Sequence, residues 1–88
     1  MQFLKQAILS RVKNARVYLF GSRVDDNKKG GDIDILILSE QKLSLKDKTH
    51  IRYSFYEKYG EQKLDLVNYR FEETSNFKDL ALLEAEEI

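Results

Sequence analysis

The run Asp32-Ile33-Asp34-Ile35-Leu36-Ile37-Leu38 constrains the fold more than any other segment of this sequence. Branched apolar residues fill it almost throughout, which is typical of a strand in the middle of a sheet. Side chains two residues apart point to the same face of a strand. The two aspartates are therefore expected to project together, and the isoleucines to take the opposite face, against helices.

Apolar spacing and turn residues predict the other elements. These are a helix over residues 3–12, a strand over Arg16–Phe20, a helix between Leu43 and Tyr59 ended by Gly60, a strand over Leu64–Tyr69, and a last helix that begins at Ser75 or Asn76 and carries Ala85 and Ile88. This order predicts an α/β (α+β) fold with a small mixed three- to four-stranded sheet flanked by helices. We expect one domain over residues 1–88.

Composition narrows the function classes. The 88 residues include 15 basic and 15 acidic side chains, so the strongly basic signature of nucleic-acid binding is absent and nucleic acid is unlikely as a direct substrate. With no cysteine and His50 as the one histidine, thiolate and zinc sites are disfavoured. No apolar run approaches the roughly 20 residues of a membrane helix. These features favour a cytoplasmic protein without membrane attachment.

A third carboxylate interrupts another predicted strand, because Asp65 lies between Leu64 and Leu66. If that strand neighbours the run with Asp32 and Asp34, the three carboxylates can converge. Oxygen ligands suit Mg²⁺ or Mn²⁺. A converging set can hold the two ions of a phosphoryl- or nucleotidyl-transfer site. Asp65 could also accept the proton of an attacking hydroxyl.

Gly21, Ser22 and Arg23 follow the first predicted strand and are candidate nucleotide ligands. A glycine permits close approach of the backbone, and amides that open into a helical turn bind phosphate oxygens. The Ser22 hydroxyl adds a donor, and Arg23 offers a planar cation suited to a triphosphate. As alternatives, Gly-Ser alone is an ordinary turn, and Arg23 alone is an ordinary surface cation.

The motif Leu19-Phe20-Gly21-Ser22-Arg23, followed by Gly31-Asp32-Ile33-Asp34, resembles the minimal nucleotidyltransferase (MNT) domains of the polymerase-β-like superfamily. Their pattern is Gly-Ser, about nine or ten residues, Asp-x-Asp on the next strand, and a third acidic residue on a later strand. Asp65 fits that third position. The resemblance covers about residues 1–70 and implies the polymerase-β-like nucleotidyltransferase core.

The resemblance also implies a function. Members are often encoded beside a HEPN-domain toxin and act as its antitoxin, and active members transfer AMP from ATP to a tyrosine of the toxin. Asp32 and Asp34 would then hold two Mg²⁺ ions, Asp65 one ion and the acceptor proton, and Gly21 to Arg23 the triphosphate. Asp25-Asp26 departs from the Arg-Gly that many relatives carry there.

Two alternatives remain open at this stage. A chain with a vestigial site could neutralise a HEPN partner by masking it, or an active enzyme could modify RNA or a small molecule. A chain of this size has room only for the catalytic core, so a partner or a second copy is expected to complete the pocket. Tyr53, Tyr56 and Tyr59 are either core or flank residues, or a partner interface.

Overall fold

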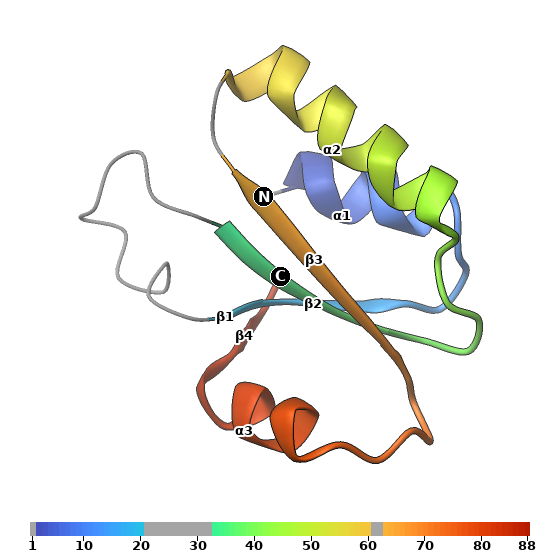
Figure 1. Ribbon diagram of the computed structural model, residues 1–88, viewed down its shortest axis with the longest axis vertical. Helices are drawn as coiled ribbons and strands as arrows, with labels where there is room; N and C mark the ends of the chain where they lie inside the picture. Colours follow the sequence, from blue (N-terminus) through green and yellow to red (C-terminus); the bar gives the residue numbers. More distant parts are fainter. Residues whose placement is uncertain (1, 21–32, 61–62) are drawn as a thin grey trace.

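The computed structural model describes residues 2–20, 33–60 and 63–88, which form a four-stranded sheet with helices on both faces (Figure 1). The elements in chain order are α1 (Gln2–Leu9), β1 (Arg16–Phe20), β2 (Ile33–Ser39), α2 (Leu45–Tyr59), β3 (Leu64–Arg70), α3 (Asn76–Glu84) and β4 (Glu86–Glu87). The strand order is β3-β2-β1-β4. Strand β2 is parallel to β3 and antiparallel to β1, and β4 is antiparallel to β1. The predicted mixed α+β fold is confirmed.

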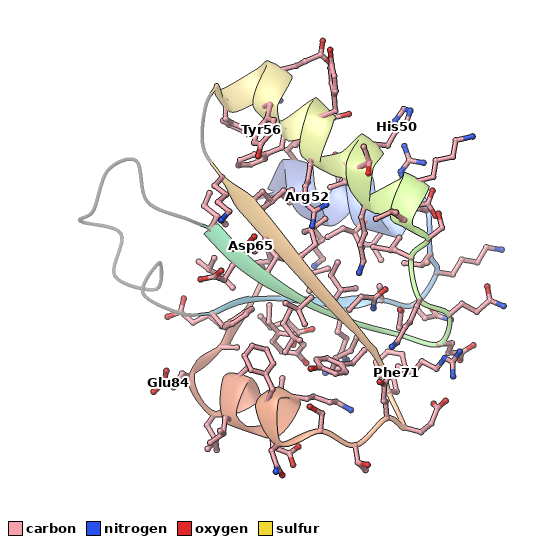
Figure 2. The ribbon with its side chains drawn as sticks, in the orientation of Figure 1. His50, Arg52, Tyr56, Asp65, Phe71 and Glu84 are labelled. Carbon is pink, nitrogen blue, oxygen red and sulfur yellow. The ribbon has the colours of Figure 1, made fainter. Side chains whose placement is uncertain are left out.

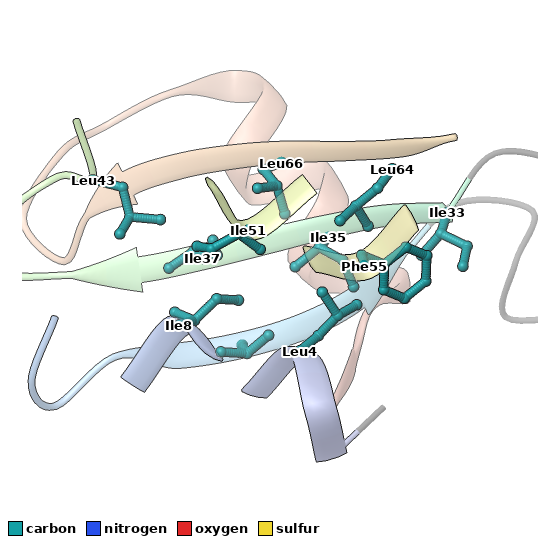
Figure 3. Close-up of a cluster of buried hydrophobic side chains, with 11 residues drawn as sticks. Leu4, Ile8, Ile33, Ile35, Ile37, Leu43, Ile51, Phe55, Leu64 and Leu66 are labelled. Atoms are coloured by element: carbon teal, nitrogen blue, oxygen red, sulfur yellow. The ribbon is translucent and has the colours of Figure 1, made fainter. Parts of the chain in front are cut away.

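Helices α1 and α2 cover one face of the sheet, and the main apolar core lies beneath them (Figure 3). The isoleucines of β2 point into this core, as the alternation of that strand predicts. They pack with Leu4 and Ile8 of α1 and with Ile51 and Phe55 of α2. Full burial of each such side chain contributes roughly 1.5–3 kcal/mol, so this layer supplies most of the apolar driving force.

Both ends of α2 are set by local chemistry. The Ser44 hydroxyl accepts the Asp47 amide at 3.0 Å, which is an N-cap. Gly60 ends the helix at φ +83°, a conformation that favours glycine, and donates its amide to the Tyr56 carbonyl at 2.8 Å. At 15 residues α2 is the longest helix, and none in the described part of the chain has the length and apolar character to cross a bilayer.

Helix α3 covers the opposite face, over Leu36 and Leu38 of β2, which are almost completely buried. Ala81 is buried on the inner side of the helix, as is Lys78. The Lys78 ammonium donates to the Arg70, Phe71 and Glu73 carbonyls at 3.3, 2.8 and 2.8 Å. This lysine therefore ties the helix to the turn that follows β3.

The C-terminal residues differ from the sequence prediction. Helix α3 ends at Glu84, and Ala85 is extended at φ −76° and ψ 149°. The chain then forms the short strand β4, and Ile88 donates its amide to the Val17 carbonyl at 2.9 Å. Ile88 reaches the core from this strand rather than from a helix. Pairing with β1 therefore overrides the helical spacing that Ala85 and Ile88 continue.

Candidate functional site

Asp34 and Asp65 lie side by side at the end of the sheet where β2 and β3 begin. The two strands are parallel, and Asp34 is the register partner of Asp65. Paired residues of neighbouring strands share a face and lie about 4.8 Å apart along the hydrogen-bonding direction. Their neighbours Ile33 and Leu64 also pair, and both are buried in the core on the other face. The predicted convergence of these carboxylates depends on β3 lying next to β2, and the sheet has this order.

Two hydrogen bonds fix the beginning of β3 and with it the register. The Ile33 amide donates to the Lys63 carbonyl at 2.9 Å, which begins the ladder between the strands. The Nε–H of Arg52 on α2 donates to the Leu64 carbonyl at 3.2 Å. Figure 2 shows Arg52 on α2 and Asp65 near the start of β3. A shift of one residue in the register of β3 against β2 would point the Asp65 side chain into the apolar core. The register of these strands therefore determines whether Asp65 lies beside Asp34.

The electrostatics of the pair favour a bound cation. Both carboxylates are half-buried, so water screens their mutual repulsion less than it would at a fully exposed position. Like charges directly opposite one another in a sheet are destabilising. A divalent ion removes this repulsion, and carboxylate oxygens are the donors that Mg²⁺ and Mn²⁺ prefer. The donor chemistry of these residues therefore fits such an ion.

The remaining predicted site residues, Gly21, Ser22, Arg23 and Asp32, lie outside the described residues, as do Asp25 and Asp26. Asp32 directly precedes Ile33, the first residue of β2. Within residues 2–20, 33–60 and 63–88, no three His, Cys, Asp or Glu side chains gather as a metal site would require. The described part of the chain thus supplies two of the three predicted carboxylates, Asp34 and Asp65.

The structure adds Phe20 to this end of the sheet. Phe20, the last residue of β1, is the register partner of Asp34. Its ring meets that of Phe77 on α3 edge to face, with centroids 5.8 Å apart. Phe20 was predicted as a strand residue and belongs to the motif that carries the family resemblance, but it was not predicted as a site residue. Its place directly before Gly21 was the available signal, but contact with Phe77 depends on how α3 packs.

Other polar groups singled out in the sequence lie elsewhere. His50 Nδ1 is 3.2 Å from Nη2 of Arg11, whose Nη1 lies 3.2 Å from Asp47, so these side chains join the turn after α1 to α2 at the surface. Tyr53, Tyr56 and Tyr59 are exposed to 65%, 43% and 49%. A hollow of about 360 Å³ is lined by Arg11 and Glu40, beyond the far end of β2. These features are separate from the carboxylate pair.

A match to a family model identifies the class of protein, and it agrees with a carboxylate pair on two neighbouring strands of the sheet. The chain belongs to the family described as "Nucleotidyltransferase domain", whose model matches residues 2–86. Almost the whole sequence takes part in this match. The family assignment agrees with the resemblance of the Gly-Ser and Asp-x-Asp motifs. Among curated proteins the sequence has no match.

Three solved structures of the same fold come from toxin–antitoxin pairs. A chain of a toxin–antitoxin with AMP-PNP has a TM-score of 0.73 at 17% identity, over 98% of this chain and 69% of that one. A chain of a mutant MntA–HpeT toxin–antitoxin gives 0.69 at 17%, over 99% and 68%. A chain from the complex of a tri-AMPylated Shewanella oneidensis HEPN toxin with MNT antitoxin gives 0.67 at 17%, over 98% and 66%. At such identities the likeness establishes the fold.

Proposed function

We propose that this chain is an Mg²⁺-dependent nucleotidyltransferase that transfers AMP from ATP to a tyrosine hydroxyl of a partner HEPN toxin, and so acts as its antitoxin. The observation that carries the proposal is the register pairing of Asp34 with Asp65 within a nucleotidyltransferase domain. The pairing brings two half-buried carboxylates together, and Asp32 precedes the same strand.

Asp34 and Asp65 would hold the metal together with Asp32, and Gly21, Ser22 and Arg23 would bind the triphosphate. Bound Mg²⁺ would offset the negative charge of the phosphates and of the leaving group. Mn²⁺ is an alternative with the same oxygen ligands. The scaffold contributes rigidity, because β2 and β3 are held by the buried core on their other face. Ligands on packed strands lose little freedom when the nucleotide binds.

The transfer step balances as a displacement at the α-phosphorus of ATP. The acceptor oxygen forms a bond to that phosphorus, while the bond from the phosphorus to the oxygen bridging to the β-phosphate breaks. AMP becomes attached to the acceptor, and pyrophosphate leaves with the bonding electrons. The Asp65 carboxylate takes the proton of the attacking hydroxyl, which is general-base work suited to a carboxylate within reach of the acceptor.

Two kinds of observation support a HEPN protein as the acceptor. Chains of similar fold come from toxin–antitoxin complexes, and one of these is a complex of a tri-AMPylated HEPN toxin with MNT antitoxin. This chain also exposes large apolar side chains that a protein partner could cover, with Leu45, Leu80 and Leu83 exposed to 76%, 65% and 81%. Scattered exposed leucines are common on proteins, so these positions support the assignment without carrying it.

The experiment is label transfer from ATP labelled at the α-phosphate to the proposed HEPN partner, in the presence of Mg²⁺. The parent chain is expected to label its partner, and Asp34→Asn and Asp65→Asn to lose the transfer. Glu84→Gln is a matched control, since it removes an exposed carboxylate of α3. Undiminished labelling by both aspartate variants, or no labelling by the parent, would count against the proposed enzyme.

The exposed leucines also favour a second candidate function, in which the chain neutralises its partner by covering it without catalysis. Protection of cells from the toxin by the Asp34→Asn variant distinguishes the two functions. An antitoxin that acts by masking keeps its protection in the Asp34→Asn variant, because the carboxylate is not needed for covering. An antitoxin that acts by AMP transfer loses protection in the same variant while still binding its partner.

A further inference from the structure

An aromatic pair lies next to the carboxylates, on the same face of the sheet. Phe20, Asp34 and Asp65 occupy register positions in a line across β1, β2 and β3. Register partners share a face, so these three side chains project to the side that α3 covers. Phe77, from the first turn of α3, meets the ring of Phe20 with centroids 5.8 Å apart and an angle of 80° between the ring planes.

Phe77 is largely exposed although its ring is in contact with Phe20. Its side chain is 46% exposed, whereas Ala81, one turn further along α3, is only 8% exposed. Phe77 therefore anchors one side of its ring on Phe20 and leaves much of the rest open. An open aromatic ring beside a phosphate-binding site can stack on a planar ligand, and each stacked base contributes appreciable affinity.

We propose that Phe20 and Phe77 form a platform on which the base of the bound nucleotide stacks. The inference rests on the proposed function, because it assumes that the triphosphate binds at the carboxylates. A single ribose joins the base to the α-phosphate, so the base has to lie close to Asp34 and Asp65. The aromatic pair is adjacent to Asp34 through the pairing of β1 with β2. Phe20 holds the platform in place, and Phe77 presents the open ring.

Stacking predicts a definite pattern of selectivity. Every base has a π-face, so a platform of this kind raises affinity for nucleotides in general and does little to choose among them. Loss of the platform should therefore weaken binding of ATP and GTP by similar factors. Inorganic tripolyphosphate has the phosphates without the base, so its binding should not depend on Phe77. The ratio of the ATP and tripolyphosphate affinities thus isolates the contribution of the base.

The experiment is calorimetric binding of ATP, GTP and tripolyphosphate, each with Mg²⁺, to the parent chain and to Phe77→Ala. We expect both nucleotides to bind roughly tenfold more weakly to the variant, and tripolyphosphate to bind as before. Phe77→Tyr should keep nucleotide affinity, because it keeps the ring. Phe77→Leu should behave as Phe77→Ala while preserving apolar contact with Phe20, so it decides the question if the alanine variant does not fold.

Phe71→Ala is the matched control, since Phe71 is 38% exposed and lies at the other end of β3 from Asp65 (Figure 2). It should leave all three affinities unchanged. Unchanged ATP binding in Phe77→Ala and Phe77→Leu would overturn the platform and leave the proposed function standing. An equal loss of ATP and tripolyphosphate would overturn it too, because the effect would not depend on the base. A parent chain that binds neither ligand would overturn the proposed function together with the platform.

Discussion

Strand β3 carries two polar side chains within its buried stretch, Asp65 and Asn68, and their surroundings differ sharply. Asn68 is 6% exposed, and its Oδ1 accepts the Leu43 amide at 2.6 Å. Its Nδ2 donates to the Ile37 carbonyl at 3.0 Å and to Ser39 Oγ at 3.1 Å. Asp65 is half-buried, and the side chain at its register position on β2 is another carboxylate.

These different surroundings indicate that Asn68 is a structural polar group, whereas Asp65 is a candidate metal ligand. Asn68 joins the end of β2 to the segment that leads into α2, so its hydrogen bonds are all used within the fold. A buried polar group satisfied in this way rigidifies the structure. Asp65 instead faces a like charge, which disfavours the folded state until a cation or another donor compensates. A fold keeps such a pair at a cost in stability where function requires it.

The largest expected effect is on catalysis, at the carboxylate end. Asp34→Asn or Asp65→Asn should lower AMP transfer by at least about a hundredfold, the scale seen when electrostatic stabilisation of a transition state is removed. Asp65→Asn should not lower the free energy of unfolding, because it removes the repulsion between the paired carboxylates. Transfer assays and urea unfolding measure the two quantities. If Asp65→Asn lost AMP transfer only because less of the protein was folded, Asp65 would have a structural role like that of Asn68, and the proposed difference between the two residues would be wrong.

The second largest expected effect is on the free energy of unfolding, at Asn68, toward the end of β3. Asn68→Ala should lower the free energy of unfolding by about 3 kcal/mol, since it leaves a buried amide and carbonyl without their side-chain partner. Transfer activity per folded molecule should be retained. Asn76→Ala, at an exposed asparagine, should change stability by no more than about 0.5 kcal/mol. Equal stabilities of the two variants would show that Asn68 is not structural.

Lys78 offers a second structural test on the opposite face of the sheet. Lys78→Met keeps the apolar stem and removes the ammonium that donates to the Arg70, Phe71 and Glu73 carbonyls. We expect the free energy of unfolding to fall by about 1–2 kcal/mol, because the lost hydrogen bonds involve a charged donor. Lys46→Met, at an exposed lysine of α2, should have little effect. Thermal unfolding of both variants makes the comparison.

The smallest effect concerns pH. Glu73 accepts hydrogen bonds from the Arg70 amide at 3.1 Å and from Lys42 at 3.2 Å, and these lower the pKa of its carboxyl below the usual value. A lowered pKa stabilises the fold above the unfolded-state value, and this contribution is lost as pH falls through the folded value. Glu73→Gln should thus be less stable than the parent at neutral pH and converge with it in acid. A difference independent of pH would contradict this.

Much of the fold could be predicted because its signals are local. The alternation in β2 predicted that its isoleucines lie in the core, and Gly60 was predicted to end α2, as it does. Strand β4 could not be predicted, because a two-residue strand has no periodicity and exists only through pairing with β1. Burial of Lys78 could not be predicted either, since its ammonium is satisfied by carbonyls of the turn that follows β3, and this depends on how α3 packs.

The candidate site was predictable in its residue types but not in its geometry. The motif pointed to Asp34 and Asp65, yet the sequence left open whether β3 lies next to β2. Their register depends on how α2 returns the chain to the sheet and on contacts such as that of Arg52 with Leu64. The pairing of Phe20 with Phe77 likewise depends on the packing of α3. Long-range packing thus determines which side chains meet.

The most direct test of the central claim is to locate a bound metal by NMR. Mn²⁺ added with ATP broadens the signals of nearby amides, and β2 and β3 rise about 3.3 Å per residue. Broadening should be strongest at Asp34 and Asp65 and should weaken along both strands toward Ser39 and Arg70. It should disappear at equal Mn²⁺ in Asp34→Asn. Broadening that is strongest at Ser39 and Arg70, or that is unchanged in the variant, would contradict a metal site at the paired carboxylates.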